Sequence, residues 1–152
     1  MTPVAATSSI DRAVIFVLDG ERYGVSLDCV QEVLRIVAFS GAHTHSETVI
    51  GMVNVRGAIA PVVDMRAVAG LPKCDLSPDT PMLICRVGEQ LVALVADAVE
   101  DILEVPEGRV QPVPALHPLA AELAGTCQVD GAVTYLLDVE ALLADVAALE
   151  AV

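Results

Sequence analysis

Aromatic and basic residues are scarce in this chain. It has no tryptophan, two tyrosines and two phenylalanines, so Val, Leu, Ile and Ala must fill its interior. This composition suits β-sheets packed with small aliphatic side chains. Only 8 residues are Lys or Arg against 21 acidic ones, which gives a formal charge of −13, and Lys73 is the sole lysine. The chain therefore lacks the clustered basic face that nucleic acid or an anionic membrane requires, and its charge favours basic partners.

Long apolar runs are also missing from the sequence. No stretch reaches the roughly 18 uninterrupted apolar residues of a membrane span, and residues 1–10 lack the basic segment of a signal peptide. The four cysteines, Cys29, Cys74, Cys85 and Cys127, show no C-x-x-C spacing. We expect them to be reduced thiols, buried or without a role. These features predict a soluble, cytoplasmic protein.

Catalytic motifs are absent. The sequence contains no G-x-x-x-x-G-K-[ST], no G-x-G-x-x-G and no G-x-S-x-G. The carboxylates from Asp97 to Glu107 could pair for acid–base chemistry, but a charged, solvated sheet edge explains them better. His43, His45 and Glu47 could bind a metal if their segment is extended, although solvated loop residues are the simpler interpretation. We expect a protein that is not an enzyme and has no cofactor or metal. A metal- or small-molecule-binding β-barrel is the competing class.

Short apolar segments separated by turn residues make up most of the chain. Besides the two strands around residues 56–57, strands are predicted over 13–18, 21–25, 30–36, 82–87, 90–96, 98–105, 125–129 and 132–137. Helices are predicted from Ser46 to near Gly51, over 65–69 after a capping Asp64, and over 136–149. The many short strands indicate small β-barrels or sandwiches. The Asp-Gly turns at 19–20 and 130–131 hint at two similar lobes, without a strong sequence repeat.

The segment from Gly51 to Arg66 is the most informative. It predicts two apolar strands joined at Arg56-Gly57, where glycine permits the positive φ of a tight turn. Arg56 should therefore lie at the tip of a rigid hairpin, and arginine is frequent at interface hot spots.

The strand predicted over residues 30–36 has no cleanly apolar side. The two-residue repeat places Val30, Glu32 and Leu34 on one side and puts Gln31, Val33 and Arg35 on the other. One face of this strand should therefore meet something other than the core.

Several of these segments together resemble the bacterial chemotaxis coupling protein (CheW-like) family, from about residue 13 to 143. They occur in the family's order: E-R-Y-G-V at 21–25, V-Q-E-V at 30–33, V-N-V-R-G at 53–57, P-V-V-D-M-R at 61–66, and residues 95–103. The resemblance implies a mostly β fold of two intertwined five-stranded SH3-like β-barrels on a shared hydrophobic core, with a few short helices and a C-terminal helix. We expect a flexible tail over residues 1–12 and one domain of two barrel subdomains over 13–150.

The resemblance also implies a non-catalytic, free-standing adaptor. Such proteins bridge the cytoplasmic tips of methyl-accepting chemoreceptors to the regulatory domain of a chemotaxis histidine kinase, at membrane-associated receptor arrays. It leaves open whether the adaptor also contacts itself in rings, and whether it serves a twitching or other non-flagellar system. Family positions for partner contact fall on Val30, Glu32, Val33, Arg56 and Ile102. Asn54, Gly57 and Asp64 are expected to set the fold.

Overall fold

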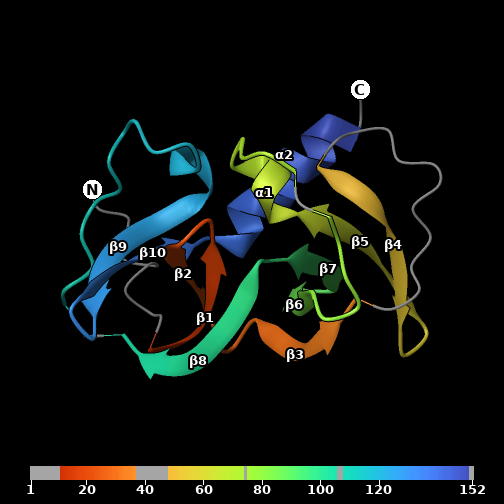
Figure 1. Cartoon of the computed structure of the whole chain (residues 1–152), viewed down its shortest axis with the longest axis horizontal. Helices are drawn as coiled ribbons and strands as arrows, with labels where there is room; N and C mark the ends of the chain where they lie inside the picture. Colours follow the sequence, from red (N-terminus) through yellow and green to blue (C-terminus); the bar gives the residue numbers. More distant parts are fainter. Residues whose placement is uncertain (1–10, 37–47, 74, 106–107, 151–152) are drawn as a thin grey trace.

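The computed structural model describes residues 11–36, 48–73, 75–105 and 108–150 (Figure 1). The strands are β1 (Arg12–Leu18), β2 (Glu21–Ser26), β3 (Val30–Arg35), β4 (Val49–Val55), β5 (Ala58–Asp64), β6 (Pro81–Val87), β7 (Gln90–Val95), β8 (Ala98–Glu104), β9 (Leu123–Val129) and β10 (Ala132–Leu137). The helices are α1 (Met65–Val68), the 3-10 turn η2 (Ala120–Glu122) and α2 (Val139–Glu150).

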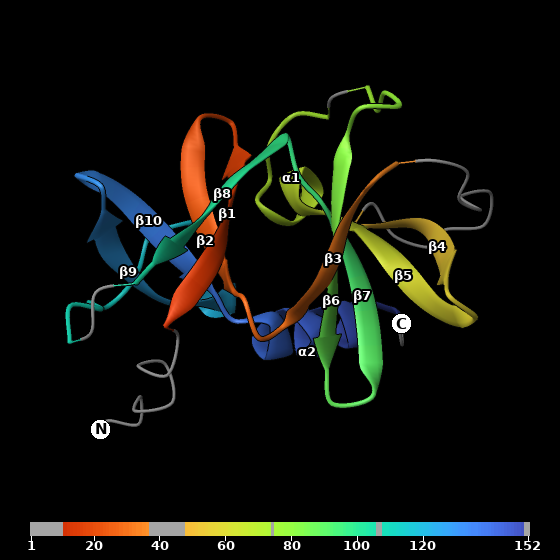
Figure 2. The same ribbon diagram turned by 90° about the horizontal axis from the view of Figure 1, so that it is seen from below.

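The strands form two five-stranded sheets, which we call the first and second lobes. The first lobe has the order β8-β1-β2-β10-β9, and the second has the order β3-β6-β7-β5-β4. Each lobe contains one parallel pairing, β2 with β10 and β5 with β7, and its other pairings are antiparallel. The chain starts in the first lobe, builds the second and then returns, so the lobes are intertwined (Figures 1 and 2). This confirms the predicted mostly β fold of two SH3-like units.

Three hairpins turn through two residues with positive φ. These pairs are Asp19-Gly20, Arg56-Gly57 and Asp130-Gly131. Left-handed backbone at both central residues defines the type I′ turn, whose twist matches that of the flanking strands. The hairpin predictions at all three sites are therefore confirmed, and Arg56 itself adopts the left-handed conformation, with φ 53°.

Apolar side chains gather in three clusters. One fills the first lobe around Ile15 and Leu136, and a second fills the other lobe around Ile84 and Val95. The largest lies between the lobes, where Phe16 of one sheet, Leu94 of the other and Leu142 of α2 belong to a single cluster. This third cluster is the shared hydrophobic core that the resemblance implied, and it joins the lobes into one packed unit.

Two helices follow directly on strands and begin with an aspartate cap. The Asp64 carboxylate accepts a hydrogen bond from the Arg66 N–H at 3.0 Å, and the Asp138 carboxylate accepts one from the Ala141 N–H at 3.1 Å. Such caps satisfy N–H groups that the helix cannot pair. The prediction for α1 is confirmed. The prediction that the last helix starts at residue 136 is wrong, because Leu136 and Leu137 still pair with β9.

The helix predicted from Ser46 to near Gly51 is wrong over its second half. Val49–Val55 is strand β4, in which Val49 pairs with Val63 and Gly51 with Val62. Pairing with β5 stabilises these residues more than a single helical turn would, and the β-branched residues Val49 and Ile50 favour a strand. Ser46 and Glu47 lie outside the described residues, as does most of the predicted tail over 1–12.

Candidate partner-binding site

Arg56 and Glu32 form a two-pronged ion pair at one end of the second lobe. Arg56 Nε donates to Glu32 Oε2 at 2.9 Å, and Nη2 donates to Oε1 at 3.2 Å. Glu32 lies on β3 and Arg56 at the tip of the β4–β5 hairpin, so the pair joins the two edges of this sheet. The two residues that sequence patterns flagged separately are therefore direct partners.

The guanidinium of Arg56 is open to solvent although it is held in place. The Arg56 side chain is 77% exposed and that of Glu32 is 22% exposed. The hydrogen bonds from Arg56 lower the pKa of the Glu32 carboxyl, and the same bonds raise the pKa of Arg56. Both side chains therefore keep their charge at neutral pH, with the guanidinium oriented by the carboxylate and one side of it free for a partner.

Strand β3 presents alternate residues to solvent and to the interior. Val33 is 43% exposed, whereas Val30 packs partly against the shared core and Leu34 against the interior of the second lobe. This alternation follows the two sides predicted from the sequence. Since β3 is an edge strand, Val33 lies on the rim of the sheet, on the side of the strand opposite Glu32.

Ile102 lies on β8, the edge strand of the other lobe, and is 50% exposed. A bulge between its pair Val14–Ile102 and the pair Phe16–Val99 distorts this strand. β3 carries a similar bulge between Val30 and Glu32. The structure thus places Ile102 on a different sheet from the other four predicted contact residues, although β3 and β8 lie along the same lower side in Figure 1.

Each of the three residues expected to set the fold takes part in a turn or a helix cap. Asn54 Oδ1 accepts a hydrogen bond from the Gly57 N–H at 2.8 Å, across the Arg56-Gly57 turn. Gly57 has a φ of 90°, and Asp64 caps α1. The Asn54–Gly57 contact thus braces the tip that carries Arg56, whereas Asp64 acts at the opposite end of β5.

Asp97 has a role that sequence patterns did not single out. Its Oδ2 accepts from Arg66 Nη1 at 2.7 Å and from the Asp19 N–H at 2.8 Å. It therefore ties the β1–β2 turn of the first lobe to α1 beside the second. The sequence predicted only a charged sheet edge here, and β8, which follows Asp97, is such an edge. Because Arg66 and Asp19 lie far from Asp97 in the sequence, local sequence patterns could not predict these contacts.

His117 is another polar residue whose tertiary contacts sequence patterns did not predict. Its side chain is 7% exposed, and its ring lies 4.3 Å from that of Tyr135. Nδ1 accepts from the Leu119 N–H at 3.0 Å, and Nε2 lies 3.4 Å from Tyr23 Oη. Burial, chiefly, and then the charge of Glu21 raise the pKa of Tyr23. This cluster anchors the proline-rich segment 112–118 onto the first lobe.

The structure gives no support to metal binding within the residues it describes. Over these ranges no group of three or more His, Cys, Asp and Glu side chains could hold a metal ion. His43 and His45, which carried the competing prediction, lie outside the described residues. Of the described part, no helix combines the length and apolar character needed to cross a bilayer.

The chain belongs to the CheW-like domain family, whose model matches residues 12–147. This match covers both lobes and α2 up to residue 147. The family consists of non-catalytic scaffold adaptors, so the chain is a coupling adaptor of chemosensory signalling and not an enzyme. Its partners, at this general level, are chemoreceptors and a histidine kinase.

Individual relatives agree with this family. The chain is 30% identical over 139 residues to the probable chemotaxis protein CheW of Rhizobium etli, covering 89% of each chain. It is 28% identical over 131 residues to the chemotaxis protein CheW of Klebsiella aerogenes, covering 85% of this chain and 79% of the relative. The crystal structure of the scaffolding protein TtCheW from Thermoanaerobacter tengcongensis matches with a TM-score of 0.76 and 27% identity, over 84% of this chain and 83% of that one.

Proposed function

We propose that this adaptor binds the regulatory domain of a chemotaxis histidine kinase through the second lobe and a chemoreceptor tip through the first. The kinase contact uses Arg56, Glu32, Val33 and Val30, and the receptor contact uses Ile102. The adaptor acts on the cytoplasmic side of the membrane, held at receptor arrays by its partners. Within it, residues 13–150 form the two-lobed domain.

The observation that carries this proposal is the exposed, oriented guanidinium of Arg56. A type I′ turn favours Asn, Asp or Gly at its first central position, and the matching turn of the first lobe has Asp130 there. Arg56 departs from this preference and adopts φ 53°. A non-glycine residue held at positive φ is a strained backbone position, and such positions cluster at functional sites. Arginine is enriched at interface hot spots, which makes this fixed and exposed charge a candidate anchor.

Coupling through such a protein needs no chemistry of its own. An adaptor that binds two partners through separate faces links their conformational equilibria when it binds one state of each partner more tightly. The shared core between the lobes provides a stiff connection for this purpose.

Calorimetry with the kinase regulatory domain tests the second lobe. We expect Arg56→Ala and Glu32→Ala each to weaken binding by about ten- to a hundredfold, because each removal leaves a charged partner unpaired at the interface. Unchanged affinity in both variants would remove these residues from the site.

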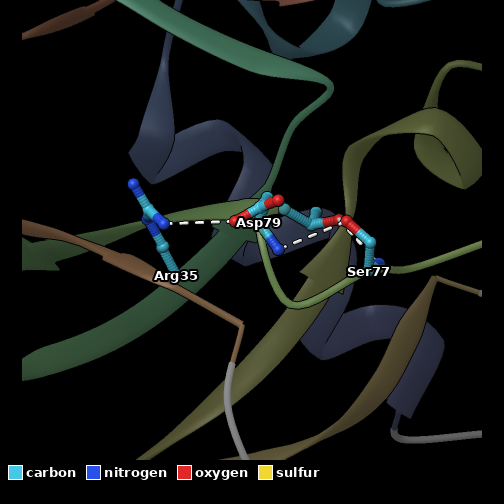
Figure 3. A network of polar contacts seen from close by, with 4 residues as sticks. Arg35, Ser77 and Asp79 are labelled. Carbon is cyan, nitrogen blue, oxygen red and sulfur yellow. Dashed lines mark hydrogen bonds and ion pairs between the residues drawn. The ribbon is translucent and has the colours of Figure 1, made fainter.

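Arg35→Ala is the matched control. Arg35 also lies on β3, and its Nη1 donates to Asp79 Oδ1 at 3.1 Å (Figure 3). That pair is more open, with side chains 73% and 84% exposed, and Asp79 belongs to a turn held by Ser77. We expect Arg35→Ala to reduce kinase affinity by at most about twofold, much less than Arg56→Ala does, because so exposed a pair contributes little.

Ile102→Glu tests the first lobe. A charge in place of an exposed apolar anchor should weaken receptor-tip binding by at least about tenfold and leave kinase binding unchanged. An equal loss of both affinities would contradict the separation of the two faces.

A further inference from the structure

A surface groove opens beside Ile102 in the first lobe. Its volume is about 710 Å³, and it lies between β8 and the β9–β10 hairpin. Ile102, Leu103 and Val129 give it an apolar lining, and Asp11, Glu104 and Asp130 add three carboxylates. A groove that combines apolar side chains with charges of one sign suits a partner segment that is apolar and oppositely charged.

The charge of this groove is not neutralised by its lining. Its described lining residues include no lysine or arginine. Within the described chain, the side chains of Asp11, Glu104 and Asp130 have neither a hydrogen bond nor an ion pair. The nearby Arg22 is already engaged, because its Nε bonds Glu100 and its Nη1 reaches the Val129 carbonyl.

The second lobe shows which group can bridge the corresponding edges of its own sheet. Its edge strand and hairpin tip are bridged by the Arg56 guanidinium, which bonds Glu32 of β3. Val33 pairs with Leu83 on β6 as Ile102 pairs with Val14 on β1, so the two exposed residues occupy matching places. In the first lobe, the residue at the position of Arg56 is Asp130. Arg12 lies opposite Glu104 in the β1–β8 pairing, but among the described residues no arginine bonds Glu104 or Asp130, so a cation that pairs with both would come from a partner.

We infer that this groove receives a receptor segment with a lysine or arginine next to its apolar anchor. The inference rests on the proposed function, and it adds the chemistry by which the first lobe selects its receptor. Ile102 contacts the apolar anchor of the segment, and Glu104 and Asp130 pair with its basic residue. Receptors with an acidic residue at that position are rejected by like charge.

The test compares two neutralised double variants of the full chain that have the same net charge. One is Glu104→Gln with Asp130→Asn in the groove. The other is Glu89→Gln on the exposed β6–β7 turn with Asp75→Asn on the exposed segment before β6. The probe is a purified chemoreceptor tip fragment from the same genome, titrated at low and high NaCl. We expect the groove variant to bind about tenfold more weakly at low salt, with a smaller difference at high salt. The control variant should stay within about twofold.

The outcomes separate this inference from the proposed function. If Ile102→Glu weakens tip binding and the groove variant does not, the receptor site stands and the charge selection is wrong. Equal losses in the groove and control variants would indicate a general effect of net charge and would also overturn the inference. If the unaltered protein does not bind the tip, the proposed receptor contact fails and the inference fails with it. Unchanged kinase affinity and thermal melting confirm that the groove variant is folded.

Discussion

The hairpin and helix of residues 53–68 occur a second time, in residues 127–142. Aligned without gaps, the two segments share Val55/Val129, Gly57/Gly131, Ala58/Ala132, Asp64/Asp138 and Ala67/Ala141. Strand pairing is also the same: Val55–Ala58 matches Val129–Ala132, and both hairpins have an irregularity where Val49–Val63 matches Leu123–Leu137. The residues at the tip differ, with Arg56 in one lobe and Asp130 in the other. The same hairpin–helix structure therefore carries opposite charges at its tip in the two lobes.

The lobes also differ in how an arginine links their edges. In the first lobe, Arg22 on the central strand β2 bonds Glu100 of β8 at 3.1 Å, and its side chain is 22% exposed. In the second lobe, buried Leu91 of β7 takes the position of Arg22, and the exposed Arg56 links the edges of the sheet instead. A recessed arginine serves the fold, whereas an exposed one is available to a partner. The following experiments test this contrast.

Gly125→Ala should have the largest effect on stability, because Val110 and Gln111 pack over the first-lobe hairpin at this position. A Cβ at Gly125 would lie 2.4 Å from Val110 Cγ1 and 3.0 Å from the Gln111 carbonyl oxygen. Gln111 forms a bridge with Thr126 at this position. We expect the free energy of unfolding to fall by about 3 kcal/mol in urea titrations, the cost of overpacking. Adding Val110→Ala should recover part of the loss, and no recovery would contradict this cause.

Glu122→Gln tests the surroundings of helix α2, which differ from those of α1. Burial of Glu122, together with its hydrogen bond to Asp145 and the charge of that residue, raises its pKa from 4.5 to about 7. The folded state then binds more protons than the unfolded state between these values, so stability falls as pH rises from about 5 to 8.

The variant removes this ionisation, and we expect it to be more stable than the unaltered protein by about 2 kcal/mol at pH 8. Urea titrations between pH 5 and 8 measure the difference. Stability curves that stay parallel across this range would show that Glu122 does not carry the pH dependence.

The smallest expected effect compares the two arginines directly. Arg22→Ala should lower the free energy of unfolding by about 1 kcal/mol, because it removes a partly buried ion pair and a bond to the Val129 carbonyl. Arg56→Ala should leave the urea midpoint unchanged, since its pair is exposed. Equal losses in the two variants would mean that both arginines serve the fold.

Sequence patterns predicted most of the strands, because alternating apolar residues and Asp-Gly or Arg-Gly turns are local signals. They also indicated Arg56 and Glu32 as separate candidates. They could not show that these two side chains meet, because the contact depends on β3 and the β4–β5 tip lying at opposite edges of one curved sheet. The repeat was hidden for a related reason, since few residues are shared and the matching strands occur in different chain order. The close approach of Val110 to Gly125 likewise depends on tertiary packing.

The threading of the chain has a consequence for its synthesis. The five strands of the second lobe are consecutive, from residue 30 to residue 95, so this lobe can be complete while the ribosome is still working. The first hairpin to emerge, β1–β2, must wait for β8, β9 and β10, the last of which ends at Leu137. Proteins generally fold from the N-terminus as they are made. Here the earliest strands are among the last to find their partners, and the exposed edges of β1 and β2 are what a chaperone would meet first.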